Sequence, residues 1–142
     1  MLKVAVLDDY QGVALEMADW ASLGSEATVR VFRDHLRQEN AIVERLGEFE
    51  VVAAMRERTP FPRSILEHMP QLRLLVTTEM RNASIDLEAA TNLGIVVCGT
   101  GGVGYPTAEL TWGLILSLVR HVAREDSTTR QGHWQTTMGI GL

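Results

Sequence analysis

SIDLEAATNLGIVVC, residues 84–98, contains the signals for one complete helix–strand unit. Its opening, Ser84 to Glu88, is typical of a helix N-terminus, because short polar side chains there accept backbone N–H groups that the first helical turn leaves free. Gly94 stands where a helix commonly ends in a left-handed residue. A short apolar run, Ile95–Cys98, follows directly and has the composition of a buried strand. The segment therefore predicts a helix that runs through Asn92, followed by a strand.

The same alternation of short apolar runs and amphipathic stretches extends along the rest of the chain. We expect further strands at Val4–Leu7, Thr28–Phe32, Val51–Met55 and Leu72–Thr77. We expect further helices around Val13–Trp20, near Glu39–Leu46, at Arg63–His68 and from Thr107 to about Arg124. This alternation is typical of a parallel sheet covered by helices. The predicted fold class is therefore α/β, with a flavodoxin-like five-stranded parallel sheet and helices on both of its faces.

The composition restricts the kind of protein. With 142 residues and 46% hydrophobic content, the chain can form one compact domain around a single apolar core. Its 13 Lys and Arg against 18 Asp and Glu give a net charge of −5, and no basic run stands out, so we expect no nucleic-acid partner. Cys98 is the only cysteine, which excludes an internal disulfide and fits a reducing compartment.

The apolar segments are too short for targeting or membrane insertion. The first, Leu2–Leu7, is followed by acidic residues before it reaches the length of a secretory signal core. The longest later run, Trp112–Val119, is well short of the roughly 20 residues that span a bilayer. We therefore expect a cytoplasmic protein without a membrane partner.

The last stretch, Asp126–Leu142, shows no clear strand, and we expect it to be either a disordered tail or a segment cut off from the remainder of a longer chain.

A glycine-rich segment, Gly99–Gly104, lies between the fifth expected strand and the longest expected helix. Its G-x-G-x-x-G pattern has the local context of a loop that holds the pyrophosphate of a dinucleotide. In such a site a second strand ends in an acidic residue roughly 20 residues further on. Asp126 stands at about that distance, but no strand leads to it. We therefore favour a flexible connection over a nucleotide loop.

Two other groups of polar residues have simple structural interpretations. Asp8-Asp9 ends the first expected strand, as in response-regulator receiver domains, but the third and fifth strands lack the Asp and Lys that those domains need. We expect this acidic pair to be a solvated strand end. The four histidines have no metal-ligand spacing and no obvious carboxylate partner, so we expect surface or packing roles for His35, His68, His121 and His133.

Polar residues follow the third and fourth expected strands. Arg56-Glu57-Arg58-Thr59 lies just beyond the carboxyl end of the third strand, where ligands of open α/β sheets gather. Guanidinium groups there could bind a carboxylate or phosphate, and a surface ion-pair cluster with Glu57 explains the pattern equally well. Thr77–Asn82 follows the fourth strand at the same edge, which favours a shared site.

Five separated elements occur in the order and at the approximate spacing of one enzyme family. They are Ser84–Ala90, Gly94–Val97 with the glycine-containing turn after it, Thr107–Glu109, a Leu-rich helix that ends near Arg120, and Arg130-x-Gly132-x-Trp134. Over nearly its whole length, the sequence resembles the D-isomer-specific 2-hydroxyacid dehydrogenases.

The resemblance implies roles for particular residues. Arg56 and Glu57 fall in the loop that faces the substrate after the third strand. Thr78, Glu79, Met80 and Arg81 match the loop whose backbone N–H groups receive the substrate carboxylate. Thr107 matches a residue that lies against the nicotinamide end of the cofactor. Residues 1–100 would then be the substrate-binding domain, and 101–142 a helix crossing into an incomplete cofactor-binding domain.

The resemblance also implies NAD or NADP as cofactor, a small 2-hydroxy or 2-keto acid as substrate, and a homodimer formed around Trp134. The family's catalytic Arg, Glu and His come later in the chain. We therefore expect no catalytic residue here, no metal site, and no activity from these residues alone. Glu79 and Arg81 stand where most members have glycine, and a Glu side chain would repel a carboxylate unless it turns away or pairs with Arg81.

Two functions remain open. The chain could be part of an oxidoreductase that transfers a hydride between a nicotinamide cofactor and a D-2-hydroxy acid or 2-keto acid. It could instead be a stand-alone flavodoxin-like module that uses the Arg56 and Glu79 loops to bind a small anion or a protein partner. The sequence downstream of Leu142 would separate the two, because only the first requires a later G-x-G-x-x-G strand with Arg, Glu and His.

Overall fold

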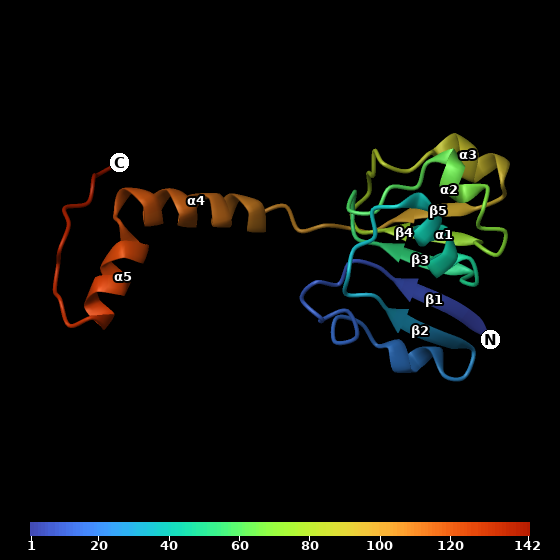
Figure 1. Ribbon diagram of the computed structural model, residues 1–142, viewed down its shortest axis with the longest axis horizontal. Helices are drawn as coiled ribbons and strands as arrows, with labels where there is room; N and C mark the ends of the chain where they lie inside the picture. Colours follow the sequence, from blue (N-terminus) through green and yellow to red (C-terminus); the bar gives the residue numbers. More distant parts are fainter. The chain divides into compact units, whose positions relative to one another are not determined.

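The chain divides into two compact units, Met1–Gly102 and Val103–Leu142. The first unit contains a sheet of five parallel strands. The computed structural model describes residues 1–142. The strands are β1 (Leu2–Val6), β2 (Ala27–Val31), β3 (Val51–Ala54), β4 (Leu74–Thr77) and β5 (Val96–Gly99). Their order across the sheet is β2-β1-β3-β4-β5 (Figure 1). This is the flavodoxin-like order, so the α/β class and the five-stranded parallel sheet are confirmed.

The two faces of the sheet differ in burial. β3 and β4 pair with Val52 opposite Leu75. Both of these side chains are fully buried, whereas their neighbours Val51 and Leu74 point to the other face and stay partly exposed. The helices of this unit are α1 (Glu39–Leu46), α2 (Arg63–Leu66) and α3 (Leu87–Asn92). All three contribute side chains to the one core that contains Val52 and Leu75.

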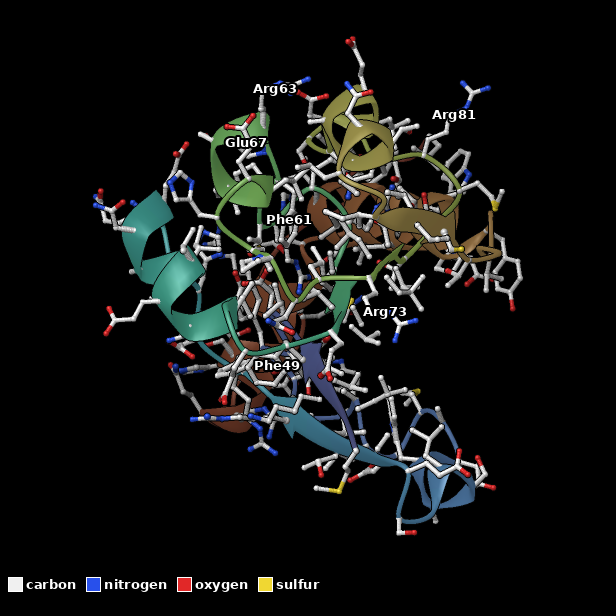
Figure 2. The ribbon with its side chains drawn as sticks, turned by 90° about the vertical axis from the view of Figure 1, so that its right-hand side faces the viewer. Phe49, Phe61, Arg63, Glu67, Arg73 and Arg81 are labelled. Atoms are coloured by element: carbon white, nitrogen blue, oxygen red, sulfur yellow. The ribbon has the colours of Figure 1, made fainter.

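That core lies between the sheet and the three helices. Phe49 and Phe61 are buried in it, and Phe61 is completely inaccessible. Figure 2 shows these two rings inside the unit, while the labelled Arg and Glu side chains, such as Arg63 and Glu67, extend outward. On the opposite face, Val4 and Val6 of β1, which are in register with Val51 and Ala53, are also buried.

The α-helix predicted over Val13–Trp20 is wrong. It forms turns, followed by a short 3₁₀ helix, η1 (Trp20–Leu23). The Asp9 carboxylate accepts the backbone N–H groups of Val13 and Ala14 at 3.1 and 3.0 Å. The indole of Trp20 donates to the Ala14 carbonyl at 2.8 Å. The Ala14 carbonyl, which a helix would pair with the N–H of Ala18, is thereby occupied by Trp20.

The helix–strand unit at residues 84–98 forms nearly as predicted. Asp86, and not Ser84, caps α3: its carboxylate accepts the N–H of Ala89 at 2.8 Å. Gly94 has a φ of 72°, the left-handed conformation expected at this helix end. α1 has the predicted ends, and β1 to β4 and α2 differ from theirs by at most two residues.

The second unit contains α4 (Pro106–Val119) and α5 (Val122–Arg130). The single helix predicted from Thr107 to about Arg124 is wrong, because His121 adopts a left-handed φ of 54° and separates the two. Residues 131–142 form no strand, and the N–H of Ile140 donates to the carbonyl of Val119 at 2.7 Å. Large apolar side chains on α4 are exposed within this unit, among them Leu110, Trp112, Leu114 and Leu118. None of the chain's helices combines the length and the hydropathy needed to cross a membrane.

Candidate functional site

Three strands end in residues with an unusual backbone conformation. Asp8 after β1, Arg56 after β3 and Glu79 after β4 have φ values of 56°, 53° and 71°. Left-handed backbone is unfavourable for residues other than glycine, and such strain clusters at functional sites. Because the strands are parallel, all three residues lie at the carboxyl edge of the sheet, where open α/β sheets bind ligands. This edge is the candidate site.

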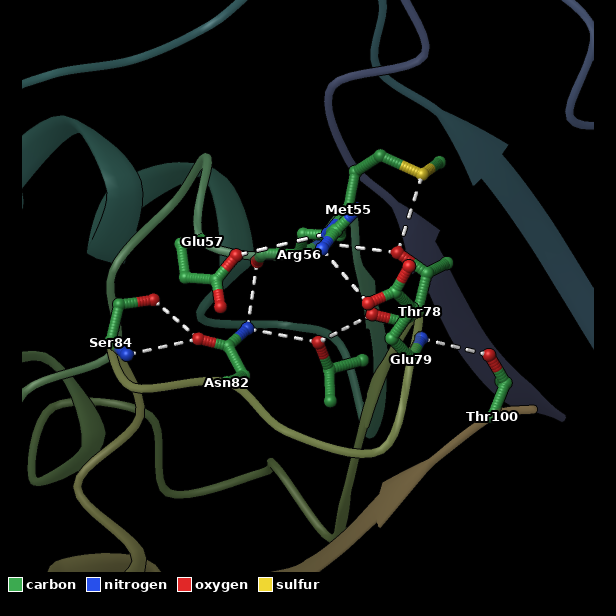
Figure 3. Close-up of polar contacts among 9 residues, drawn as sticks. Met55, Arg56, Glu57, Thr78, Glu79, Asn82, Ser84 and Thr100 are labelled. Carbon is green, nitrogen blue, oxygen red and sulfur yellow. Dashed lines mark hydrogen bonds and ion pairs between the residues drawn. The ribbon is translucent and has the colours of Figure 1, made fainter. Parts of the chain in front are cut away.

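The loops after β3 and β4, Met55–Thr59 and Thr78–Asn82, are bonded to each other, and we call them the paired loops. The backbone N–H of Arg56 donates to the Thr78 hydroxyl at 3.1 Å. The Asn82 amide donates to the Arg56 carbonyl at 2.7 Å and to the Thr77 hydroxyl at 2.9 Å (Figure 3). Both backbone polar groups of Arg56 are therefore held by the neighbouring loop.

The guanidinium of Arg56 forms ion pairs within the paired loops. Its Nη2 lies 2.8 Å from Glu79 Oε2, and its Nε lies 3.9 Å from Glu57 Oε2 (Figure 3). Sequence reasoning left two roles open for Glu79, turning away or pairing with Arg81. The structure shows a third arrangement, in which Glu79 pairs with Arg56. Since Arg56 and Glu79 are each about half exposed, solvent weakens this pair, and an incoming anion can compete for Arg56.

The structure brings four of the six predicted substrate-binding residues together in one network of hydrogen bonds and ion pairs, and the other two lie outside this network. Arg56, Glu57, Thr78 and Glu79 form one network. Met80 and Arg81 are exposed on the next turn of the loop, and Figure 2 shows Arg81 projecting from the surface. Both line a depression beside the loop, together with Thr77, Asn82, Ile85 and Val97 among others.

Three residues that were not predicted as site residues support the site. Asn82 joins the paired loops as described, and Ser84 fixes its side chain by donating from Oγ and from the backbone N–H to Asn82 Oδ1 at 2.6 and 3.0 Å. Thr100, after β5, accepts the N–H of Glu79 at 3.0 Å. Asn82 is a residue type common in turns, but its partner Arg56 is 26 residues away, and sequence alone gives no signal for that pairing.

The expectation that Asp8-Asp9 is a solvated strand end is wrong, since both residues are buried. Asp8 Oδ2 accepts the Thr59 hydroxyl at 2.6 Å, and Asp8 Oδ1 lies 2.9 Å from His35 Nδ1. His35 therefore has a carboxylate partner, contrary to the expectation for the four histidines. Hydrogen bonds from backbone N–H groups, that of Ala14 first, hold the pKa of the Asp9 carboxyl below its ordinary value, aided by the nearby charge of Arg33.

The glycine-rich segment does not form a nucleotide loop with the residues present. A Cβ at Gly99 would lie 2.7 Å from the Glu79 carbonyl oxygen, so this glycine is needed for close contact with the β4 loop. Asp126 follows the glycine-rich segment at about the spacing of the acidic residue that binds the ribose in a dinucleotide site. It lies in α5 and not at the end of a strand. Thr107 is exposed in the first turn of α4, where its carbonyl accepts the Thr111 hydroxyl at 2.7 Å. The chain's residues therefore do not fit a complete dinucleotide site, and no group of three or more metal-ligating side chains is found.

Comparison with known proteins places the chain in a family. The model of the D-isomer specific 2-hydroxyacid dehydrogenase catalytic domain matches residues 4–138. A glyoxylate reductase of Aeropyrum pernix is 42% identical over 71 residues, 49% of this chain and 21% of the relative. A hydroxypyruvate reductase of Blautia hydrogenotrophica is 26% identical over 141 residues, 95% of this chain and 42% of the relative.

A solved structure of a phosphoglycerate oxidoreductase from Vibrio cholerae is similar over the whole chain, with a TM-score of 0.83 and 36% identity. A putative D-3-phosphoglycerate dehydrogenase from Ralstonia solanacearum gives a TM-score of 0.81 and 32% identity over 99% of this chain. The chain spans less than half the length of these proteins, 45% and 44%. Because the family model covers nearly every residue, the chain belongs to the D-isomer specific 2-hydroxyacid dehydrogenases.

Proposed function

We propose that the paired loops bind the carboxylate of a small 2-hydroxy or 2-keto acid. The observation that carries this proposal is the position of Arg56: its backbone N–H and carbonyl are both fixed by the β4 loop, while its guanidinium stays half exposed at the carboxyl edge of the sheet. A guanidinium on a backbone held in this way can bind a carboxylate through two parallel hydrogen bonds. Relatives named glyoxylate reductase and hydroxypyruvate reductase support this class of ligand.

In this proposal the chain is the substrate-binding part of an NAD- or NADP-dependent dehydrogenase. The nicotinamide, when bound, supplies or accepts the hydride. The chain's own residues bind and orient the acid: Arg56 and Thr78 at the centre, Glu57 and Glu79 beside the guanidinium, and Met80 and Arg81 at the exposed flank. No residue of this chain is proposed as the proton donor, and Thr107 is proposed to lie against the nicotinamide.

The proposed organisation follows the two units. Residues 1–100 would be the substrate-binding domain, and 101–142 would be the crossing helix and the beginning of the cofactor domain. The apolar side chains exposed on α4 support this assignment, since a helix that is apolar on several sides is usually buried by other parts of a protein. We also propose a homodimer in the cytoplasm for the complete enzyme.

The competing proposal is a stand-alone module that binds a small anion or a protein partner through the same loops. Dehydrogenase activity separates the two, because a module needs no nicotinamide. The 142-residue chain should show no 2-keto-acid-dependent oxidation of NADH under either proposal. A polypeptide that continues into a cofactor domain should show it only under the first.

The ligand class can be tested on the chain itself. We expect glyoxylate and hydroxypyruvate, titrated into ¹⁵N-labelled protein, to shift the amide signals of the paired loops and of Thr100. Acetate, which lacks the 2-oxo group, serves as the control ligand and should bind more weakly. Signals that stay unchanged, or that change only in the second unit, would overturn the proposed site.

A further inference from the structure

The buried carboxylate of Asp8 is the most unexpected group at the carboxyl edge of the sheet. Its side chain is 1% exposed, and its backbone is in the left-handed region. Burying a carboxylate and holding a non-glycine residue in this conformation both cost free energy. The contacts of Asp8 therefore have to offset both costs.

Those contacts converge on the end of the β3 loop. Asp8 Oδ2 accepts the hydroxyl of Thr59, which is itself buried, at 2.6 Å. The Asp8 carbonyl accepts Arg58 Nη1 at 2.8 Å. The guanidinium carbon of Arg58 also lies 4.6 Å from the centre of the Tyr10 ring. Asp8 thus forms hydrogen bonds with two consecutive residues, Arg58 and Thr59, which lie 50 and 51 positions further along the chain.

The held residues close the turn that carries Arg56. The N–H of Arg58 donates to the carbonyl of Met55 at 3.3 Å, so Met55–Arg58 is a tight turn with Arg56 inside it. The first half of this turn is fixed by Thr78 and Asn82. The last residue of the turn, Arg58, and the adjoining Thr59 are tied to the segment after β1 by the contacts to Asp8 and by the packing of Arg58 on Tyr10.

His35 completes the surroundings of the carboxylate. Its Nδ1 lies 2.9 Å from Asp8 Oδ1, and the Tyr10 hydroxyl lies 3.5 Å from the same oxygen. Each carboxylate oxygen of Asp8 therefore has a partner, one from the β3 loop and one from the segment after β2. A carboxylate bonded on both sides is held in one orientation.

We infer that Asp8 is a positioning residue for substrate binding: through Thr59 and Arg58 it fixes the turn that presents Arg56 to the substrate carboxylate. This inference rests on the proposed function of the paired loops. Asp8 itself touches no substrate in this arrangement, since its side chain is buried. It acts by keeping the turn in its binding conformation before the ligand arrives, which lowers the ordering cost of binding.

The test uses Thr59→Val, which keeps the shape of the side chain but removes the hydroxyl donor, and Thr59→Ser, which restores it. Thr91→Val is the matched control, because the Thr91 hydroxyl donates to the Leu87 carbonyl at 2.8 Å in α3, away from the paired loops. The oxalate dianion is the probe, as a mimic of a 2-keto acid. Three quantities are measured for each variant: the oxalate Kd, the amide shifts and ¹⁵N relaxation of residues 56–58, and the thermal midpoint.

If Asp8 positions the turn, Thr59→Val weakens oxalate binding about fivefold, the effect of roughly one lost hydrogen bond. It also shifts and broadens the signals of residues 56–58. Thr59→Ser restores both quantities, and Thr91→Val changes neither. A purely structural role would lower the thermal midpoint of Thr59→Val while leaving the Kd and the loop signals as in the wild type, and that result would overturn the inference.

The failure of the proposed function looks different in the same experiment. In that case the wild type shows no oxalate binding at the paired loops, or Arg56→Ala binds oxalate as tightly as the wild type does. Either result overturns the substrate site and the role of Asp8 with it. Wild-type binding that is lost in Arg56→Ala but unaffected by Thr59→Val overturns the role of Asp8 alone.

Discussion

Arg56 Nη2 and Glu79 Oε2 form a 2.8 Å ion pair between two residues that both have left-handed backbone, each at the end of its own strand. The pair explains how this chain accommodates Glu79 at a position where the resemblance led us to expect glycine. The carboxylate that would repel a substrate is held by the same guanidinium that would bind it. Under the proposed function, substrate binding at Arg56 would be an exchange of one carboxylate for another.

Removing the negative charge of Glu79 should therefore tighten anion binding. We expect Glu79→Gln to lower the oxalate Kd about threefold, because an exposed ion pair is worth no more than about 1 kcal/mol. Glu57→Gln is the matched control: its carboxylate lies 3.9 Å from Arg56 Nε, so its effect should be smaller. Calorimetric titration measures both values, and weaker binding by Glu79→Gln would argue against the exchange.

The contact between the β4 and β5 loops should be sensitive to a single methyl group. At Gly99 an added Cβ would lie 2.7 Å from both the Glu79 carbonyl oxygen and Met80 Cα, which are backbone atoms. We expect Gly99→Ala to destabilise the first unit by about 1–3 kcal/mol, as overpacking does. Gly101→Ala is the control, since no atom lies within 4 Å of its added Cβ. Equal unfolding midpoints in urea for the two variants would contradict this packing.

The segment after β1 should depend on pH through Asp9. Backbone N–H groups, that of Ala14 foremost, lower the pKa of the Asp9 carboxyl from its ordinary value of 3.8. A lowered folded-state pKa means that the charged form stabilises the fold above the ordinary value, and that this contribution is lost as the pH falls through the lowered value. We expect Asp9→Asn to be less stable than the wild type near about pH 7 and the difference to shrink by about pH 3. Urea unfolding at the two pH values tests this, and a difference that grows at low pH would refute it.

The shared core of the sheet and the three helices should determine the stability of the first unit. Leu75 is fully buried in this core, whereas Leu87 on α3 is largely exposed. We expect Leu75→Ala to cost about 2–5 kcal/mol of unfolding free energy. Leu87→Ala should stay within about 0.5 kcal/mol of the wild type. Chemical denaturation followed by circular dichroism gives both values, and similar losses would mean that the core has been misidentified.

The fold was predictable where the signals are local. The cap, the terminal glycine and the apolar run of residues 84–98 act over short distances, and α3 and β5 form there within one or two residues of expectation. The predicted helix over Val13–Trp20 does not form, and the Ala14 carbonyl, which a helix would pair with the N–H of Ala18, accepts the Trp20 indole instead. The break at His121 carries no Gly or Pro, so no residue type in its sequence marks it.

The site was predictable only in part, for a different reason. Residues at the ends of parallel strands must share an edge, and this placed Arg56 and Thr78 in neighbouring loops from the order of the strands alone. The partners that fix them are decided by the folded chain. Asp8 pairs with His35 and Thr59, which lie 27 and 51 residues away, and an acidic pair at a strand end looks the same in sequence whether it is solvated or buried.

The most direct test of the central claim is the kcat/KM for NADH- or NADPH-dependent reduction of a 2-keto acid. It is measured on the longest natural polypeptide that contains these 142 residues, with glyoxylate, pyruvate and hydroxypyruvate as substrates. The account predicts turnover with at least one of them, and a loss of about tenfold or more in kcat/KM for Arg56→Ala, as expected when a charge-assisted contact to the substrate is removed. No 2-keto-acid-dependent oxidation, or an Arg56→Ala variant with unchanged kcat/KM, would contradict it.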